Sequence, residues 1–98
     1  MIFMMKINRI IWKETFVEKI ERKHLVTMGE VEEILHGGKK VYRIAKGDVK
    51  GEDVYLALGK TSAGRYLSVF FILKRNHDVL PISARDMDIK ERRKYGHA

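Results

Sequence analysis

A change in hydrophobic period at two consecutive glycines constrains the fold of this chain more than any other feature. Before His36-Gly37-Gly38, apolar residues recur at the spacing of amphipathic helices. From Lys39 onward they form short runs separated by turn residues, which is typical of strands. Helices followed by an antiparallel sheet indicate an α+β fold. The chain has 98 residues, so we expect one domain over residues 1–98.

Two short helices are predicted before the glycines. The first covers Glu14 to Lys23, and its apolar residues share one face: Phe16, Val17 and Ile20. The second begins at about Met28, because Thr27 and Glu30 have the spacing of a capping box. It ends at Gly37, since glycine supplies the backbone conformation with which many helices end. The two helices are expected to form a hairpin that packs on the sheet.

Five short strands are predicted, and they are residues Arg9–Trp12, Val41–Ala45, Val54–Leu58, Arg65–Lys74 and Val79–Ala84. The segment Tyr66–Leu73 is apolar on both faces, which indicates a central strand. Pro81 has no N–H to donate, so the last strand is predicted at an edge or with a bulge. We therefore expect two N-terminal helices packed on a mainly antiparallel sheet of four to five strands.

A short C-terminal helix is predicted from Ile89 to about Tyr95, with Asp88 and Glu91 as a second capping pair. Only its two end residues are apolar anchors, so we expect it to dock loosely. At the other end of the chain, residues 1–8 are predicted to be a leader into the first strand. Lys6 interrupts their apolar stretch, so we expect neither a signal peptide nor a membrane span.

The composition excludes several kinds of site. The chain has no cysteine, which rules out disulfides and thiolate zinc centres. Its four histidines are scattered, and no phosphate-binding loop or nucleotide-binding glycine motif is present. We therefore expect no metal and no cofactor. The net charge is +7, and residues 1–36 carry equal numbers of acidic and basic side chains. The excess positive charge lies in residues 37–98 and favours a polyanion or an acidic protein as partner.

Three residues at the ends of predicted elements are candidates for catalysis. His24 closes the first helix and is either a general base or a favourable cation at the helix C-terminus. Arg65 opens the predicted central strand and Arg85 follows the last one. If these strands form a hairpin, the two guanidinium groups lie near one end of the sheet and can hold a phosphate. The alternative is ion pairing with neighbouring carboxylates, namely Asp86, Asp88 and Glu91.

The C-terminal helix carries a run of basic side chains that includes Arg92 and Arg93. These two residues, with Lys23, are predicted RNA-backbone contacts. A solvated helix face is the alternative interpretation of such a run. Glu91 is interpreted first as a capping residue and second as an acid or base. Tyr95 is interpreted as an anchor of the helix, or as a surface on which a base stacks.

Several of these short segments, in this order and spacing, resemble the BrnT-type toxins of the RelE-like superfamily of bacterial and archaeal toxin–antitoxin ribonucleases. The segments are Trp12, Lys23-His24 with Val26, Glu30–Glu33, Leu58-Gly59, Gly64-Arg65, Ile82–Arg85 and Glu91–Arg93 with Tyr95. The resemblance extends from Ile11 to Tyr95. Lys13 and Leu25 stand where members of the family usually have an acid and a glycine.

The resemblance implies the toxin of a type II toxin–antitoxin system: a cytoplasmic, metal-independent endoribonuclease that uses the 2′-hydroxyl of its RNA substrate. His24, Arg65 and Arg85 would be its catalytic residues. It also implies an antitoxin partner of the ribbon-helix-helix type, and operator DNA would be contacted only through that protein. The alternative function is a non-catalytic module, a degenerate toxin that binds nucleic acid or a partner protein.

Overall fold

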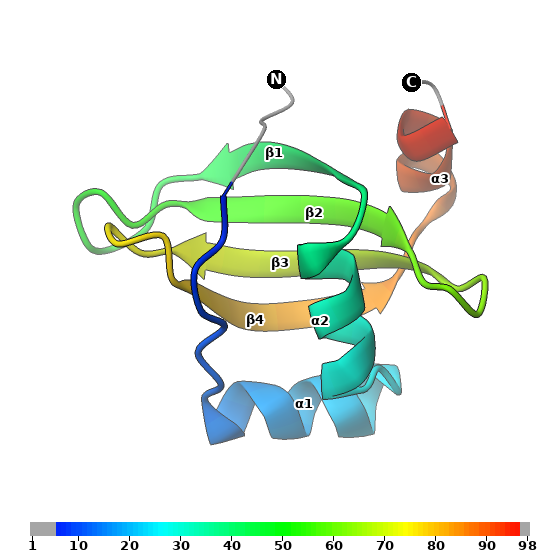
Figure 1. The fold of residues 1–98 in the computed structure, drawn as a ribbon, viewed down its shortest axis with the longest axis horizontal. Coiled ribbons are helices and arrows are strands. Elements are labelled where there is room, and N and C mark those ends of the chain that lie inside the picture. The colour runs from blue at the N-terminus through cyan, green and yellow to red at the C-terminus, as the bar shows by residue number, and fades with distance from the viewer. Residues whose placement is uncertain (1–5, 97–98) are drawn as a thin grey trace.

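A helical layer and a four-stranded sheet make up the fold (Figure 1). The computed structural model describes residues 6–96, so the first five residues of the predicted leader lie outside the described part. The elements in chain order are α1 (Glu14–His24), α2 (Met28–His36), β1 (Lys39–Ala45), β2 (Val54–Lys60), β3 (Tyr66–Leu73), β4 (Val79–Asp86) and α3 (Ile89–Gly96). The predicted α+β class is confirmed, with two N-terminal helices, an antiparallel sheet and a short C-terminal helix.

The sheet is a simple antiparallel meander with strand order β1-β2-β3-β4. The segment Tyr66–Leu73 is an inner strand, as its two apolar faces predicted. The strand that contains Pro81 is at an edge and also bulged. Phe70 lies opposite Ser83 while Phe71 lies opposite Pro81, so Ile82 has no partner in the register. Both parts of the proline prediction are therefore confirmed.

The predicted strand at Arg9–Trp12 is wrong. Only Ile10 forms a bridge, a parallel one with Val79. The Val79 N–H donates to the Arg9 carbonyl at 2.8 Å, and the Ile11 N–H donates to the Val79 carbonyl at 2.7 Å. Along this outer edge the next residue to face the segment is Pro81, which has no N–H. The ladder therefore ends after one residue.

Three strands are longer than predicted. β1 begins at Lys39, β2 continues to Lys60, and β4 continues to Asp86, which lies opposite Leu67. Backbone pairing continues through these polar residues because it depends on N–H and C=O groups and not on side-chain polarity. As a result Arg85 lies within β4, although the sequence placed it just after the strand.

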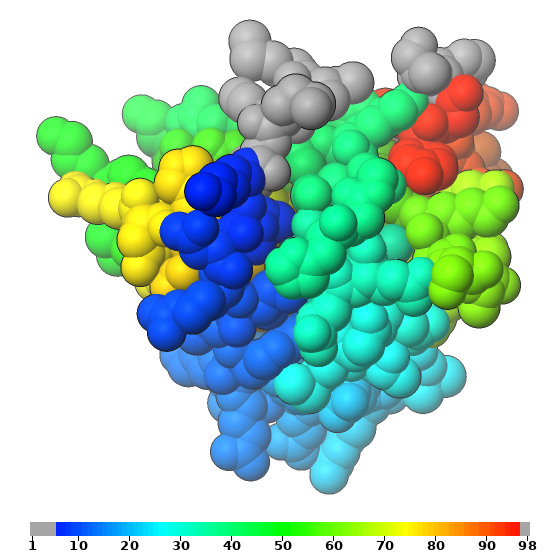
Figure 2. All heavy atoms as spheres, viewed as in Figure 1, coloured from blue at the N-terminus to red at the C-terminus, as the bar shows by residue number. Residues whose placement is uncertain are grey.

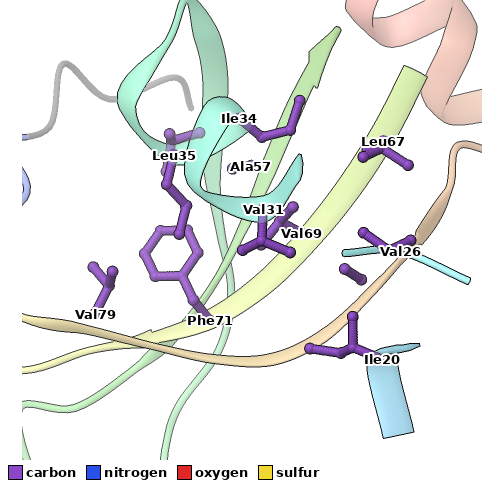
Figure 3. Close-up of a cluster of buried hydrophobic side chains, with 12 residues drawn as sticks. Ile20, Val26, Val31, Ile34, Leu35, Ala57, Leu67, Val69, Phe71 and Val79 are labelled. Atoms are coloured by element: carbon purple, nitrogen blue, oxygen red, sulfur yellow. The ribbon is translucent and has the colours of Figure 1, made fainter. Parts of the chain in front are cut away.

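The main core lies between the helices and one face of the sheet. Figure 3 shows Ile34 and Leu35 of α2 above Val69 and Phe71 of β3, all of them buried. The space-filling view in Figure 2 shows the N-terminal segment, α1 and α2 covering this face. A second, smaller cluster lies on the other face of the sheet, and its members are Tyr42, Leu56 and Leu58 with Phe70, Met87 and Tyr95 packed against them. Helix α3 is held there by Tyr95, whereas Ile89 is exposed.

The joint between α1 and α2 contains a leucine with left-handed backbone conformation. Leu25 has φ 53° and ψ 41°, and its side chain is 74% exposed. Directly after it, the Val26 N–H donates to the Ile20 carbonyl at 3.3 Å, and Val26 itself is buried. The capping box of Thr27 and Glu30 then starts α2 as predicted. The chain therefore reverses direction over a few residues, with one of them in a conformation that favours glycine.

Replacing Leu25 with glycine is expected to stabilise the protein by about 1 kcal/mol, because left-handed backbone costs a residue with a Cβ atom about this much. The exposed side chain contributes little packing that would be lost. Urea unfolding of the wild type, Leu25→Gly and Leu25→Ala measures the effect. Leu25→Ala removes the same side chain but keeps Cβ, so it should remain close to wild type. Equal stability of the two variants would contradict the explanation.

Candidate functional site

Arg65 joins both helices to the end of β4. Its Nε and Nη2 groups donate to the two carboxylate oxygens of Asp86, at 2.9 and 3.3 Å. Its Nη1 group donates to Glu30 Oε1 at 3.0 Å and to the Leu25 carbonyl at 2.6 Å. The second donor of Nη2 reaches the His24 carbonyl at 3.3 Å. A guanidinium has five N–H groups, so every donor of Arg65 has a partner within the protein.

The turn before β3 fixes the backbone of Arg65. The buried Thr61 hydroxyl accepts from the Arg65 N–H at 3.0 Å, and Gly64 has φ 95°, which glycine adopts without strain. The hydrogen bonds from Arg65 hold the pKa of Asp86 below its ordinary value. The same carboxylate, and then Glu30, raise the pKa of Arg65. Arg65 is therefore a permanent cation held at the joint of the two helices.

Arg85 forms a second, separate site. Its Nη1 and Nη2 groups donate to Glu91 Oε1 and Oε2 at 2.6 and 2.9 Å, the two-point geometry typical of an arginine–carboxylate pair. The guanidinium lies 5.2 Å from the centre of the Phe70 ring. Glu91 Oε1 also accepts from the buried Ser68 hydroxyl at 2.9 Å. We call these four side chains, Arg85, Glu91, Ser68 and Phe70, the Arg85 site.

Glu91 is more buried than the arginine that it binds. Its side chain is 13% exposed, against 34% for Arg85. Burial alone raises the pKa of Glu91, but the hydrogen bonds from Arg85, the Asp88 N–H and Ser68 outweigh it, and the pKa lies below its ordinary value. Glu91 and Asp88 also form the predicted reciprocal cap, with bonds of 2.9 and 2.8 Å. One carboxylate therefore both caps α3 and neutralises Arg85.

The two arginines lie at the same end of the sheet but on opposite faces. Arg85 is opposite Ser68 in the register, and the neighbour of Ser68, Leu67, belongs to the core beneath the helices. Since successive side chains alternate between faces, Arg85 and Ser68 face the α3 side. Arg65 binds Glu30 and the carbonyls at the end of α1, which places it on the helical side. The structure does not bring the two guanidinium groups into one phosphate cradle.

His24 and Lys23 lie at the C-terminal end of α1, on the side of Arg65. The carbonyl of His24 accepts from Arg65, whereas its imidazole has no hydrogen-bond partner among residues 6–96. Lys23 is exposed, and with Arg22 it places positive charge in the last turn of the helix, which ends at His24. This position is the favourable one for cations at a helix C-terminus. Both interpretations of His24, a general base and a cation at the helix end, therefore stay predictions.

Arg92 belongs to a cluster of tyrosines and cations on the α3 side of the sheet. Its guanidinium carbon lies 3.6 Å from the centre of the Tyr66 ring. The Tyr66 ring makes an edge contact with Tyr95, with ring centres 6.0 Å apart. Three lysines approach rings of the same cluster: Lys60 is 5.1 Å from the centre of the Tyr66 ring, Lys94 is 3.8 Å from that of Tyr42, and Lys40 is 5.6 Å from that of Tyr95. Arg93 is exposed on the same helix.

We did not predict from the sequence that three strand residues line the α3 side of the sheet: Tyr42, Tyr66 and Ser68. All three lie in strands, where alternation places them on the face opposite Val41 and Leu67. That alternation was a usable signal, because polar or aromatic residues that alternate with core residues must face the other side of the sheet. The short segments around each tyrosine do not show which cation packs against its ring.

Among residues 6–96, no group of three or more His, Cys, Asp or Glu side chains is placed to hold a metal ion. No helix of that part of the chain is both long enough and apolar enough to cross a bilayer.

Comparison of the sequence with known protein families shows which family this chain belongs to. Residues 12–91 match the family model described as the ribonuclease toxin, BrnT, of type II toxin–antitoxin systems. The chain belongs to the BrnT family. No curated protein matches the chain. The family implies an RNA substrate and an antitoxin partner, and the matched segment contains Arg65, Arg85 and Glu91.

Replacing Arg65 of this BrnT chain with alanine is expected to lower the free energy of unfolding by about 2 kcal/mol, because it leaves partly buried acceptors without a charged donor. Urea unfolding provides the measurement. Arg22→Ala is the matched control, since Arg22 forms an exposed pair with Glu18 on one helix and should contribute less than about 0.5 kcal/mol. Equal effects of the two substitutions would show that Arg65 does not hold the joint together.

Glu91→Gln is expected to make the stability of this BrnT chain less sensitive to acid. The folded pKa of Glu91 is lower than its ordinary value of 4.5, so the ionised carboxylate stabilises the fold above that pH. This stabilisation is lost as the pH falls from 4.5 through the lowered pKa. Urea unfolding of both proteins at a series of pH values should show the wild type losing more stability than the variant. Parallel curves would contradict the pairing of Glu91 with Arg85.

Proposed function

We propose that this chain is an endoribonuclease toxin that cleaves RNA without a metal ion and binds the reacting phosphate through Arg85. The observation that supports this most is the two-point bond between Arg85 and the Glu91 carboxylate, at 2.6 and 2.9 Å. A phosphate presents two oxygens to the same fork, so it can replace the carboxylate. Arg85 is one-third exposed, and RNA can therefore reach it.

The proposed reaction forms one bond to phosphorus and breaks another. The 2′-oxygen of the RNA attacks the adjacent phosphorus, and the bond from phosphorus to the 5′-oxygen of the next nucleotide breaks. The products are a 2′,3′-cyclic phosphate and a 5′-hydroxyl end. A base takes the proton of the 2′-hydroxyl, and the leaving 5′-oxygen gains one from an acid. The charge of Arg85 stabilises the oxygens of the phosphorane in the transition state.

We propose different parts for the other predicted residues. Arg92 and Arg93 contact the RNA backbone beside Arg85, because all three lie on the α3 side. His24 lies on the Arg65 side, across the sheet from Arg85, so for it we propose a part in positioning the RNA strand at the end of α1. Lys23 would attract the RNA strand from the end of α1. For Arg65 we propose a positioning part, because its bonds to Asp86 hold the end of β4 in which Arg85 lies.

The proposed partner is an antitoxin of the ribbon-helix-helix type, and operator DNA would be contacted only through that protein. The net charge of +7 suits a partner segment rich in acidic side chains. Such a segment can compete with RNA for the basic surface of α3.

A second candidate is a non-catalytic RNA- or partner-binding module. One observation favours it: carboxylates of the same chain already neutralise both arginines of the catalytic hypothesis, Arg65 and Arg85. Such a module would bind RNA through α3 and leave it intact.

Cleavage of labelled RNA by the purified protein distinguishes the two functions. Arg85→Ala is expected to lower kcat/KM by about 100-fold or more, because it removes the charge that stabilises the phosphorane. Arg43→Ala is the matched control, since Arg43 forms a half-exposed pair with Asp53 away from the site and should cleave like wild type.

Growth after induced expression extends the test to cells. The wild type should slow growth, and Arg85→Ala should not, while circular dichroism shows that both are folded. If the wild type neither cuts RNA nor slows growth, the non-catalytic module is the better description. If Arg85→Ala cleaves as well as the wild type, the reacting phosphate lies elsewhere.

A further inference from the structure

A shallow depression on the outer side of α3 lies next to the Arg85 site. Its lining residues are Met87, Asp88, Ile89, Arg92 and Arg93. Asp88 connects the two places, because its backbone N–H donates to Glu91 Oε1, the oxygen that also accepts from Arg85 Nη1. A group bound in the depression is therefore a neighbour of whatever replaces Glu91 on Arg85.

One wall of the depression is a guanidinium group whose plane is held in place. The distance of 3.6 Å from the Arg92 guanidinium carbon to the centre of the Tyr66 ring corresponds to van der Waals contact between two flat groups. The edge contact from Tyr95 fixes the Tyr66 ring in turn. Arg92 packs on Tyr66 and is an exposed lining residue of the depression, so part of its guanidinium group is accessible to a ligand there.

The depression also offers apolar surface beside positive charge. Ile89 is a large apolar residue, and yet it is 72% exposed. Met87, another lining residue, is partly buried against the smaller apolar cluster. Arg93 supplies a further cation at the rim. A flat apolar ligand that is joined to a negative charge suits such a surface.

We propose that this depression binds a nucleobase of single-stranded RNA, stacked on the accessible part of the Arg92 guanidinium group, next to the phosphate at Arg85. Bases stack on guanidinium planes as well as on aromatic rings. Arg93 binds the phosphate of the same nucleotide. Tyr66 is a positioning residue, because it acts by holding the plane of Arg92. The inference rests on the proposed ribonuclease function and adds a place where the enzyme binds a base.

The combination of a held plane and an apolar floor favours a base over an acidic segment of the antitoxin. A carboxylate would bind the edge of the Arg92 guanidinium group, where the N–H groups are. It would make no stacking contact with the face of the plane. Ile89 and Met87 provide apolar surface that a base stacked on Arg92 can contact. The antitoxin is nevertheless an outcome that the experiment must distinguish.

Fluorescence anisotropy with two short labelled probes tests the proposal. One is a 2′-O-methyl oligoadenylate, which lacks the free 2′-hydroxyl and is not cleaved, and the other is an abasic backbone of equal length and charge. Arg92→Lys keeps the charge but loses the plane, so it should bind the oligoadenylate about 10-fold more weakly and the abasic probe unchanged. Tyr66→Leu should have the same effect. Arg43→Lys is the matched control and should change neither affinity.

Several results would overturn the proposal. If the wild type binds both probes equally, the surface binds only charge. If Arg92→Lys weakens both probes equally, the plane does not select a base. If Arg92→Lys leaves both probes unchanged but weakens binding of the purified antitoxin, the depression belongs to the protein partner. In each case RNA cleavage by the wild type would leave the ribonuclease function standing, whereas loss of cleavage as well would remove both.

Discussion

The fold depends on a single guanidinium group that connects the turn between α1 and α2 to the end of β4, which is far away in the sequence. Arg65 binds two carbonyls at the end of α1, a carboxylate at the start of α2 and a carboxylate at the end of β4. The carbonyls at a helix end lack partners within the helix, and a cation is the best donor for them. The helical hairpin is therefore attached to the sheet at its turn, while apolar packing holds the rest of its length.

The sheet separates this structural cation from the surface proposed for function. Beneath α1 and α2 the side chains are apolar and buried (Figure 3). Arg65 lies at one end of that layer, where it binds the carbonyls at the end of α1. On the other face, α3 covers only part of the sheet and brings Glu91 to Arg85. The carboxylate that neutralises Arg85 belongs to a helix with no buried residue, so exchanging it for a phosphate disturbs little of the core. The proposed exchange of the Glu91 carboxylate for a phosphate at Arg85 is therefore compatible with a stable fold in a small chain.

Local chemistry explains which parts of the fold were predictable from the sequence. Both capping pairs, Thr27 with Glu30 and Asp88 with Glu91, involve residues three apart, and both are present. The edge position and bulge of β4 followed from Pro81 alone. The strand at Arg9–Trp12 failed because its length depends on what the neighbouring edge offers, and Pro81 removes the next donor. The left-handed backbone of Leu25 also went unpredicted, because the residue type does not favour it and the turn between the helices imposes it.

The sequence by itself determined the class of fold, the family and the set of basic residues, since period, capping and motif spacing are properties of short segments. It also placed Arg65 and Arg85 at one end of the sheet, because a hairpin brings the start of one strand next to the end of the other. Only the tertiary structure decided that the two arginines face opposite sides, that Arg65 is fully occupied by the protein and that Tyr66 supports Arg92. These facts depend on register and on contacts between distant segments: a shift of one residue in pairing moves every side chain to the other face.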